Sequence, residues 1–245
     1  MIGLKGVPAV WGGIEKYVEE IGHILVRRGH AVTVFGSAWY VPAGIGRRYR
    51  GLRVRRVPTI RMKSTDALTN ALCAAAWASL THYDVVQFHG YASYYFVPWM
   101  RRFGKPTVVT AHGVESGWDN PKYGTLARRI IQTAFGIGVR RADRVTTVAA
   151  HLQGRIKNRY GVTSRVLPSG LDNAAPAPVE LIRHKYGLQG LDYLLFLGRI
   201  DPIKRVHWLP DLLPHIGPDI RIVVAGGPQD ASTQDYYRGI MQRWA

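Results

Sequence analysis

Two adjacent glycines close a turn-rich stretch near the start of this 245-residue chain. After Gly12 and Gly13, apolar residues recur at spacings of three and four up to Gly29, which predicts an amphipathic helix. Adjacent glycines let a ligand approach the backbone closely, and the amides at a helix N-terminus favour an anion such as phosphate. The spacing fits neither a Walker loop nor a Gly-x-Gly-x-x-Gly dinucleotide site, so a tight turn without a ligand is the alternative.

A second place for anion chemistry lies in the last quarter of the chain. Gly198 and Arg199 follow an apolar run, and Lys204 comes five residues later. Ligands of open α/β sheets bind outside the carboxyl ends of the strands, where a guanidinium fork and an ammonium charge suit a diphosphate. The alternative is that these cations form surface ion pairs with Asp201 and Asp211.

Histidines stand at the ends of two further predicted strands. His112 follows residues 107–111, and His89 ends residues 85–89. Such a histidine can hydrogen-bond a sugar hydroxyl or a developing charge, and Glu115 could orient His112 or contact an acceptor hydroxyl. The alternative is an imidazole bonded only to backbone groups. No third ligand accompanies His112 and Glu115, so we expect no metal.

Parallel strands with crossover helices would position these residues. Short apolar or β-branched runs predict strands at residues 31–35, 52–57, 85–89, 107–111, 144–148 and 164–167, with a very short first strand at 1–4. Helices are predicted from residue 14 to Gly29 and at 65–80, 92–103, 123–141 and 149–160. The first helix would carry Glu15, Lys16, Glu19 and Glu20 on its polar face. The alternation predicts a doubly wound parallel α/β sheet.

The sequence becomes rich in proline after the last predicted strand of this sheet. Residues 168–178 contain three prolines, which predicts a linker. Beyond it we predict helices at 179–186, 206–213 and from 233, and strands at 193–198 and 220–226. We therefore expect a Rossmann-like domain at residues 1–172, a linker and first helix at 173–190, and an incomplete second Rossmann-like domain at 191–245.

Basic residues dominate the first part of the chain. Residues 1–170 hold 25 Lys and Arg against 8 Asp and Glu, whereas the remainder holds 8 of each. One run without an acid would attract an anionic membrane surface, although a merely solvated Arg-rich surface is an equal alternative. No recognition motif accompanies the run, so no nucleic acid is expected. The run consists of Arg47, Arg48, Arg50, Arg53, Arg55, Arg56, Arg61 and Lys63.

The cysteine content and the hydropathy of the sequence indicate the cellular compartment in which the protein is expected. The one cysteine, Cys73, excludes an internal disulfide framework and suits a reducing compartment. No apolar stretch approaches the roughly 18 residues that a spanning helix needs, and the start lacks the apolar region of a secretory signal. We expect a cytoplasmic protein, which the basic run of residues 47–63 would bring to the inner face of the cell membrane as a peripheral protein.

Six motifs in order along the chain resemble the retaining GT-B glycosyltransferases of family 4. They are residues 6–9 with 11–15, residues 28–34, residues 110–113, residues 167–172, residues 198–200 with Lys204, and residues 223–228. The resemblance implies a GT-B fold of two Rossmann-like domains.

The resemblance also implies an activity. Family members transfer a sugar from a nucleotide-diphosphate donor to a glycan or lipid-linked acceptor, as in cell-envelope or exopolysaccharide synthesis, with retention of configuration and without a metal or another cofactor. By motif, Gly12 and Gly13 would face the donor diphosphate, and Arg199 and Lys204 would neutralise the leaving diphosphate. His112 would act at the transferred sugar, with Glu115 and His89 contacting the sugar or the acceptor. No enzymic nucleophile is implied.

This sequence departs from the family pattern at two places. Ser169 stands where the family usually has Asn before Gly170. The chain also ends before the glycine-rich turn and the paired glutamates that grip the donor in the family. The alternative expectation is therefore a truncated, non-catalytic module, derived from a glycosyltransferase, that docks on a membrane or on a partner chain.

Overall fold

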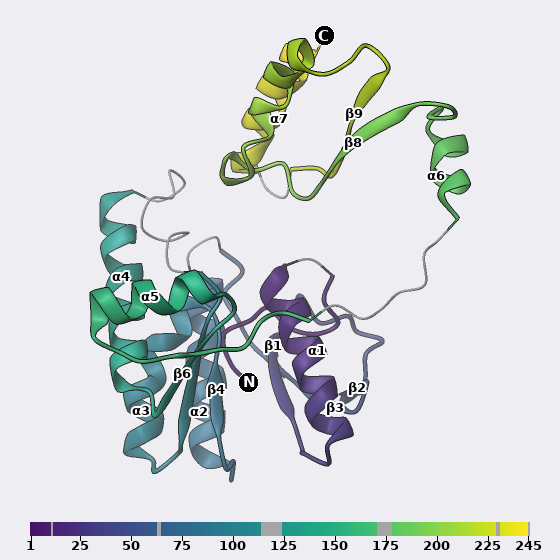
Figure 1. Cartoon of the computed structure of the whole chain (residues 1–245). Coiled ribbons are helices and arrows are strands. Elements are labelled where there is room, and N and C mark those ends of the chain that lie inside the picture. The colour runs from purple at the N-terminus through teal and green to yellow at the C-terminus, as the bar shows by residue number, and fades with distance from the viewer. Residues whose placement is uncertain (11, 63–64, 114–123, 171–177, 229–230, 245) are drawn as a thin grey trace. The chain divides into compact units, whose positions relative to one another are not determined.

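The computed structural model describes residues 1–10, 12–62, 65–113, 124–170, 178–228 and 231–244. For residues 231 and 232 it describes the backbone only. The chain forms two compact units, residues 1–171 and 172–245 (Figure 1). Both are built from parallel strands and helices, which confirms the predicted Rossmann-like α/β class. Most of the predicted linker, residues 171–177, lies outside the described residues.

The strands of the first unit form two sheets. One has the order β1-β3-β2, and the other runs β4-β5-β6-β7. Every neighbouring pair is parallel except β2 and β3. The strands are β1 (Thr33–Ser37), β2 (Arg48–Tyr49), β3 (Leu52–Val57), β4 (Val86–Phe88), β5 (Thr107–Ala111), β6 (Arg144–Thr147) and β7 (Arg165–Val166).

Strand β2 was not predicted. It pairs antiparallel with β3 through the two-residue turn Arg50 and Gly51, both at positive φ. That geometry matches the right-handed twist of a hairpin but usually selects Asn-Gly or Asp-Gly. An Arg-Gly pair carries little turn signal, so the hairpin escaped sequence analysis.

The first residues of the chain join the two sheets (Figure 1). Ile2 bonds to β4, because its amide donates to the Gln87 carbonyl at 2.9 Å, and the Met1 carbonyl accepts from Phe35 of β1 at 3.1 Å. The spatial order therefore becomes β3, β1, first segment, β4, β5, β6. The predicted first strand is reduced to one bridge, because Gly3 at φ 91° leaves the extended conformation and a Cβ there would collide with Ser93.

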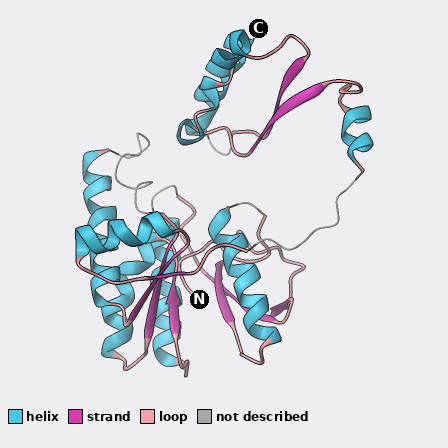
Figure 2. Ribbon diagram, viewed as in Figure 1, coloured by secondary structure: helices cyan, strands magenta, loops and turns pink. Residues whose placement is uncertain are grey.

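Helices cover both faces of this combined sheet (Figure 2). Val34 of β1 packs in the apolar cluster that contains Tyr17 and Val18, whereas its neighbour Phe35 packs in the cluster that contains Ala71. This alternation makes the sheet doubly wound. The helices are α1 (Gly13–Arg27), α2 (Asp66–Leu80), α3 (Val97–Arg102), α4 (Thr125–Arg141) and α5 (Ala150–Tyr160), with a 3-10 helix η1 (Tyr91–Phe96) before α3.

The single helix predicted at residues 92–103 is wrong. The structure has η1 followed by α3, with Val97 donating to the Tyr94 carbonyl where the two join. An α-helix would need the next amide to bond the same carbonyl, and Pro98 has no N–H. The proline therefore separates the tighter turn from the α-helix.

In its described residues, the second unit contains one pair of parallel strands, β8 (Asp192–Leu197) and β9 (Ile220–Ala225). Its helices are α6 (Val179–Lys185) and α7 (Ala231–Trp244). The helix predicted at 206–213 is wrong, because Pro210 and Pro214 lack amide donors and the segment forms short 3-10 turns. These turns are η2 (Pro202–Lys204), η3 (Val206–Trp208) and η4 (Pro210–His215).

Candidate active site

A cavity lies where the direction of the strand order reverses in the first unit. The first segment and β4 are central, with β1 and β3 following on one side and β5 and β6 on the other. Crevices at such a switch point, outside the carboxyl ends of the strands, are where open α/β sheets bind ligands. The cavity measures about 330 Å³ and is lined by Gly13, Ile14, Gly90, Tyr91, Tyr94, His112, Val148 and Ser169.

Carboxylates of α1 hold the loop that leads to the adjacent glycines. The Lys5 amide donates to Glu15 Oε1 at 2.9 Å, and the Ala9 amide donates to Glu19 Oε2 at 2.7 Å. Glu15 and Glu19 are 7% and 5% exposed, so their predicted place on a polar helix face is wrong. The loop amides draw both carboxylates inward, because each buried amide requires an acceptor.

Gly12 and Gly13 are placed by this arrangement. Gly12 precedes α1 at φ 106°, and a Cβ there would collide with the Glu15 carboxylate. Gly13 begins the helix and lines the cavity, and a Cβ there would meet no atom within 4 Å. Gly12, the N-cap of α1, has no side chain to cap the helix, and Gly13 and Ile14 line the cavity, so the first amides of α1 are placed to meet an anionic or polar ligand.

The imidazole rings of His112 and His89 form a pair, in which His112 lines the cavity and His89 is buried beneath it. His89 Nδ1 lies 3.0 Å from His112 Nε2, and the Tyr17 ring packs edge-on against His112 with centroids 4.8 Å apart. Burial lowers the pKa of His112 to about 4, and burial together with His112 holds the pKa of His89 well below its usual value. Both rings are therefore neutral at pH 7.

His89 is not on the cavity wall, so its predicted contact with the sugar or the acceptor stays a prediction. His89 is 0% exposed, and its ring contacts the rings of His112 and Tyr17. The alternation of a strand explains this: His89 continues β4 into the interior, whereas Gly90 reaches the cavity. His112 itself lies on the cavity wall, as expected for a residue that meets a ligand. Glu115 lies outside the described residues.

Two tyrosines that sequence analysis missed hold the backbone on either side of His112. The Tyr94 hydroxyl donates to the Thr110 carbonyl at 2.7 Å, and the Tyr91 hydroxyl donates to the Gly113 carbonyl at 2.6 Å. Both come from η1, whose three-residue turn places residues three apart on one side. The repeated tyrosines after Gly90 were the available signal.

The basic run of residues 47–63 serves several separate purposes. Arg50 pairs with Glu19 and Glu20, and Arg56 donates to the carbonyls of residues 42, 43 and 45. Arg55 stacks on Trp77, and Arg61 stacks on Trp39. Arg47, Arg48 and Arg53 are exposed, and Lys63 lies outside the described residues. Part of the run therefore stabilises the fold.

In the second unit, Arg199 and Lys204 lie beyond the carboxyl end of β8, and both are exposed. The Gly198 amide bonds the Ala225 carbonyl at 3.0 Å, and the Ile200 amide bonds the Gly227 carbonyl at 3.1 Å. A Cβ on Gly226 would collide with the Gly198 carbonyl, so glycines allow the two strand ends to touch.

The carboxylates considered as alternative partners of these cations have other contacts. Asp201 accepts from the Ile203 amide at 3.1 Å, and Asp211 pairs with Arg243. The position of Arg199 and Lys204 beyond the carboxyl end of a parallel strand is of the kind that suits a diphosphate.

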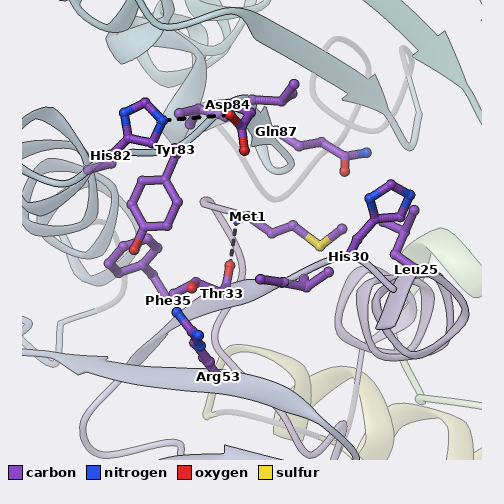
Figure 3. Close-up of a pocket in the computed structure, with 15 residues that line it drawn as sticks. Met1, Leu25, His30, Thr33, Phe35, Arg53, His82, Tyr83, Asp84 and Gln87 are labelled. Carbon is purple, nitrogen blue, oxygen red and sulfur yellow. Dashed lines mark hydrogen bonds and ion pairs between the residues drawn. The ribbon is translucent and has the colours of Figure 1, made fainter. Parts of the chain in front are cut away.

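A second cavity, of about 440 Å³, lies at the opposite ends of the strands of the first unit (Figure 3). Its wall includes Met1, Thr33 and Val86, and the Met1 amine donates to the Thr33 carbonyl at 2.8 Å. Burial lowers the pKa of this amine to about 5. The amino ends of parallel strands are not the usual place for a ligand, so the 330 Å³ cavity is the better candidate site.

No three His, Cys, Asp or Glu side chains in the described part of the chain come together as a metal site. None of the helices described is long and apolar enough to cross a membrane.

Known proteins resemble this chain in sequence. The D-inositol 3-phosphate glycosyltransferase of Geodermatophilus obscurus is 32% identical over 82% of this chain and 48% of its own length. The GDP-mannose-dependent alpha-(1-6)-phosphatidylinositol monomannoside mannosyltransferase of Mycobacterium tuberculosis is 28% identical over 89% of this chain and 58% of its own length. The chain thus spans about half the length of these curated relatives.

Solved structures resemble it in fold. Anabaena Alr3699/HepE in complex with UDP-glucose has a TM-score of 0.72 at 16% identity, covering 95% of this chain and 62% of that one. A glycosyltransferase from Rickettsia africae has a TM-score of 0.55 at 14% identity, covering 96% and 62%. These likenesses support the GT-B fold. The model of Glycosyltransferase Family 4 matches residues 11–174, more than half of the chain, and the protein therefore belongs to that family.

Proposed function

We propose that this protein transfers a sugar from a nucleotide-diphosphate sugar to a hydroxyl acceptor, with retention of configuration and without a metal. The observation that carries the proposal is the cavity at the switch point, where an uncapped helix N-terminus and a neutral His112 face the same space. Membership of glycosyltransferase family 4 supports the reaction class.

The proposal assigns a role to groups of each unit taken by itself. In the first unit, Gly12 and Gly13 let the donor approach the amides of α1, and His112 hydrogen-bonds an oxygen of the sugar. Both imidazoles there are neutral at pH 7, so they supply no positive charge. The charge of the leaving diphosphate would be neutralised by Arg199 and Lys204 of the second unit.

The proposed acceptor is a glycan or a lipid-linked molecule at the inner membrane surface. The Mycobacterium relative is named for a phosphatidylinositol monomannoside, and the first 170 residues carry the whole basic excess of the chain. Exposed bases near an anionic bilayer contribute about 1 kcal/mol each. Sedimentation with anionic vesicles that weakens in Arg47→Ser/Arg48→Ser/Arg53→Ser would support this part, and equal sedimentation with neutral vesicles would contradict it.

Calorimetric titration with UDP- and GDP-sugars tests the donor site. The double variant Arg199→Ala/Lys204→Ala should bind the preferred donor more than about 100-fold more weakly, because each of the two charge-assisted hydrogen bonds contributes about 1.5–3 kcal/mol. Lys185→Ala/Arg238→Ala is the matched control, since both residues are exposed in the same unit and the charge change is equal. Unchanged binding by the first variant would remove Arg199 and Lys204 from the proposal.

A non-catalytic docking module is the alternative that the same titration decides. If no donor binds the wild-type chain while both units are folded, these 245 residues are not a free-standing transferase. Where a donor does bind, the anomeric configuration of the product by NMR tests retention. Turnover in the presence of a chelator tests metal independence.

A further inference from the structure

The pair of histidines behind the cavity shares a single hydrogen. His89 Nδ1 and His112 Nε2 are 3.0 Å apart, with ring centroids at 5.3 Å. A neutral imidazole has one N–H donor and one bare acceptor nitrogen, so one ring must donate and the other accept. In either direction His112 Nε2 is occupied, so within the described part of the chain Nδ1 is the ring nitrogen left for a ligand in the cavity.

The surroundings of His89 indicate which ring donates. His89 is 0% exposed, and its Nε2 has no hydrogen-bond partner among the described residues. If Nε2 carried the hydrogen, a buried N–H would lack an acceptor, and such orphaned donors are rarer than underused acceptors. The less costly arrangement keeps the hydrogen on Nδ1 of His89, directed at His112.

We propose that His89 is a positioning residue that holds His112 in the tautomer with its hydrogen on Nδ1. His112 then presents an N–H donor to the cavity, suited to a hydroxyl or phosphoryl oxygen of the sugar nucleotide, and is unable to accept a proton as a general base. The nature of this ligand rests on the proposed function. The tautomer rests only on the geometry of the two rings and on the burial of His89.

Nitrogen-15 NMR of the ligand-free chain at pH 7 tests the tautomer directly. Long-range proton–nitrogen correlations distinguish a protonated from a bare ring nitrogen, and His112→Gln assigns the signals by their loss. We expect a protonated Nδ1 and a bare Nε2 on His112. A protonated Nε2 on His112 in the wild-type chain would overturn the proposal, and this result needs no variant at His89.

Two substitutions of His89 separate its hydrogen bond from its bulk. The side-chain amide in His89→Asn reaches the position of Nδ1 and retains a donor, whereas His89→Leu fills the space without one. The Asn variant should keep the tautomer, and the Leu variant should shift His112 toward the Nε2-protonated form. An unchanged His112 spectrum in a folded Leu variant would contradict the positioning role.

Donor titration gives a second readout. The Leu variant should bind the preferred sugar nucleotide about 10-fold more weakly than the wild-type chain, and the Asn variant should recover most of that loss. Equal affinity in both variants would contradict the link between tautomer and ligand. If the wild-type chain binds no sugar nucleotide, the proposed function fails, while the spectrum still decides the tautomer.

Discussion

Gly12 and Gly13 are neighbours in the sequence but differ in what a side chain would do to them. Gly12 has φ 106° and faces the Glu15 carboxylate, so Gly12→Ala should lower the free energy of unfolding of the first unit by about 1–3 kcal/mol. Gly13→Ala is the control, because its methyl group meets no protein atom within 4 Å and alanine favours a helix.

Urea unfolding and donor titration distinguish the two glycine variants. Gly13→Ala should keep full stability and still weaken donor binding, since its methyl group enters the cavity. Equal stability of Gly12→Ala and the wild-type chain would show that Glu15 does not hold the loop as the contacts indicate.

His112 gives the stability of the first unit a dependence on pH. Its pKa is about 4 in the folded chain and about 6.5 when unfolded, so below pH 6.5 the unfolded state binds a proton that the folded state does not. The stabilisation present above pH 6.5 is therefore lost as the pH falls toward 4. From pH 7 to 5, His112 should account for a loss of about 2 kcal/mol.

Comparison with His112→Gln isolates this contribution. Glutamine places an amide group near the position of Nε2 but does not titrate, so its free energy of unfolding should fall less between pH 7 and 5. Parallel pH profiles of the two proteins in urea would contradict the lowered pKa of His112.

At the scale of elements, α4 approaches η1 closely enough to require a glycine. A Cβ on Gly138 would lie 2.7 Å from the Tyr94 Cβ, so Gly138→Ala should destabilise the first unit by about 1–3 kcal/mol. It should also disturb the bond from Tyr94 to the Thr110 carbonyl, two residues before His112. The matched change Gly154→Ala in α5 meets nothing within 4 Å and should stabilise by up to about 1 kcal/mol.

Thermal unfolding of the two glycine variants checks this packing. Opposite shifts of the melting temperature are expected, downward for Gly138→Ala and upward for Gly154→Ala. A melting temperature for Gly138→Ala at or above the wild-type value would mean that α4 and η1 are not in close contact.

At the scale of the whole molecule, the two units differ in the size of their cores. In the described part of the second unit, the buried apolar cluster consists of Ile200, Val206 and Ile240, whereas the first unit has two larger clusters. Small cores leave little net stability. Calorimetry should therefore show two unfolding transitions, with the second unit unfolding at the lower temperature.

Calorimetry of a shortened chain of residues 1–170 assigns each unfolding transition to one of the two units. It should retain the upper transition and lose the lower one. A single cooperative transition in the full chain that disappears in the shortened chain would show instead that the units stabilise each other.

The sequence by itself determined the family and, except for β2 and the 3-10 turns, the order of strands and helices. Apolar periodicity, glycine stops and strand-end motifs are local signals, and they placed Gly12, Gly13, His112, Arg199 and Lys204 next to strand or helix ends. The errors within elements arose where prolines removed amide donors, at Pro98 and Pro210, or where the Arg50 turn lacked the usual residues.

Only the tertiary structure decided how these residues meet. It turned Glu15 and Glu19 inward to the loop amides, buried His89 behind His112, and brought the tyrosines of η1 to the backbone beside His112. These contacts join residues on different elements, and a single sequence carries no local signal for them. Each follows from the requirement that a buried polar group find a partner, which only the packed fold can meet.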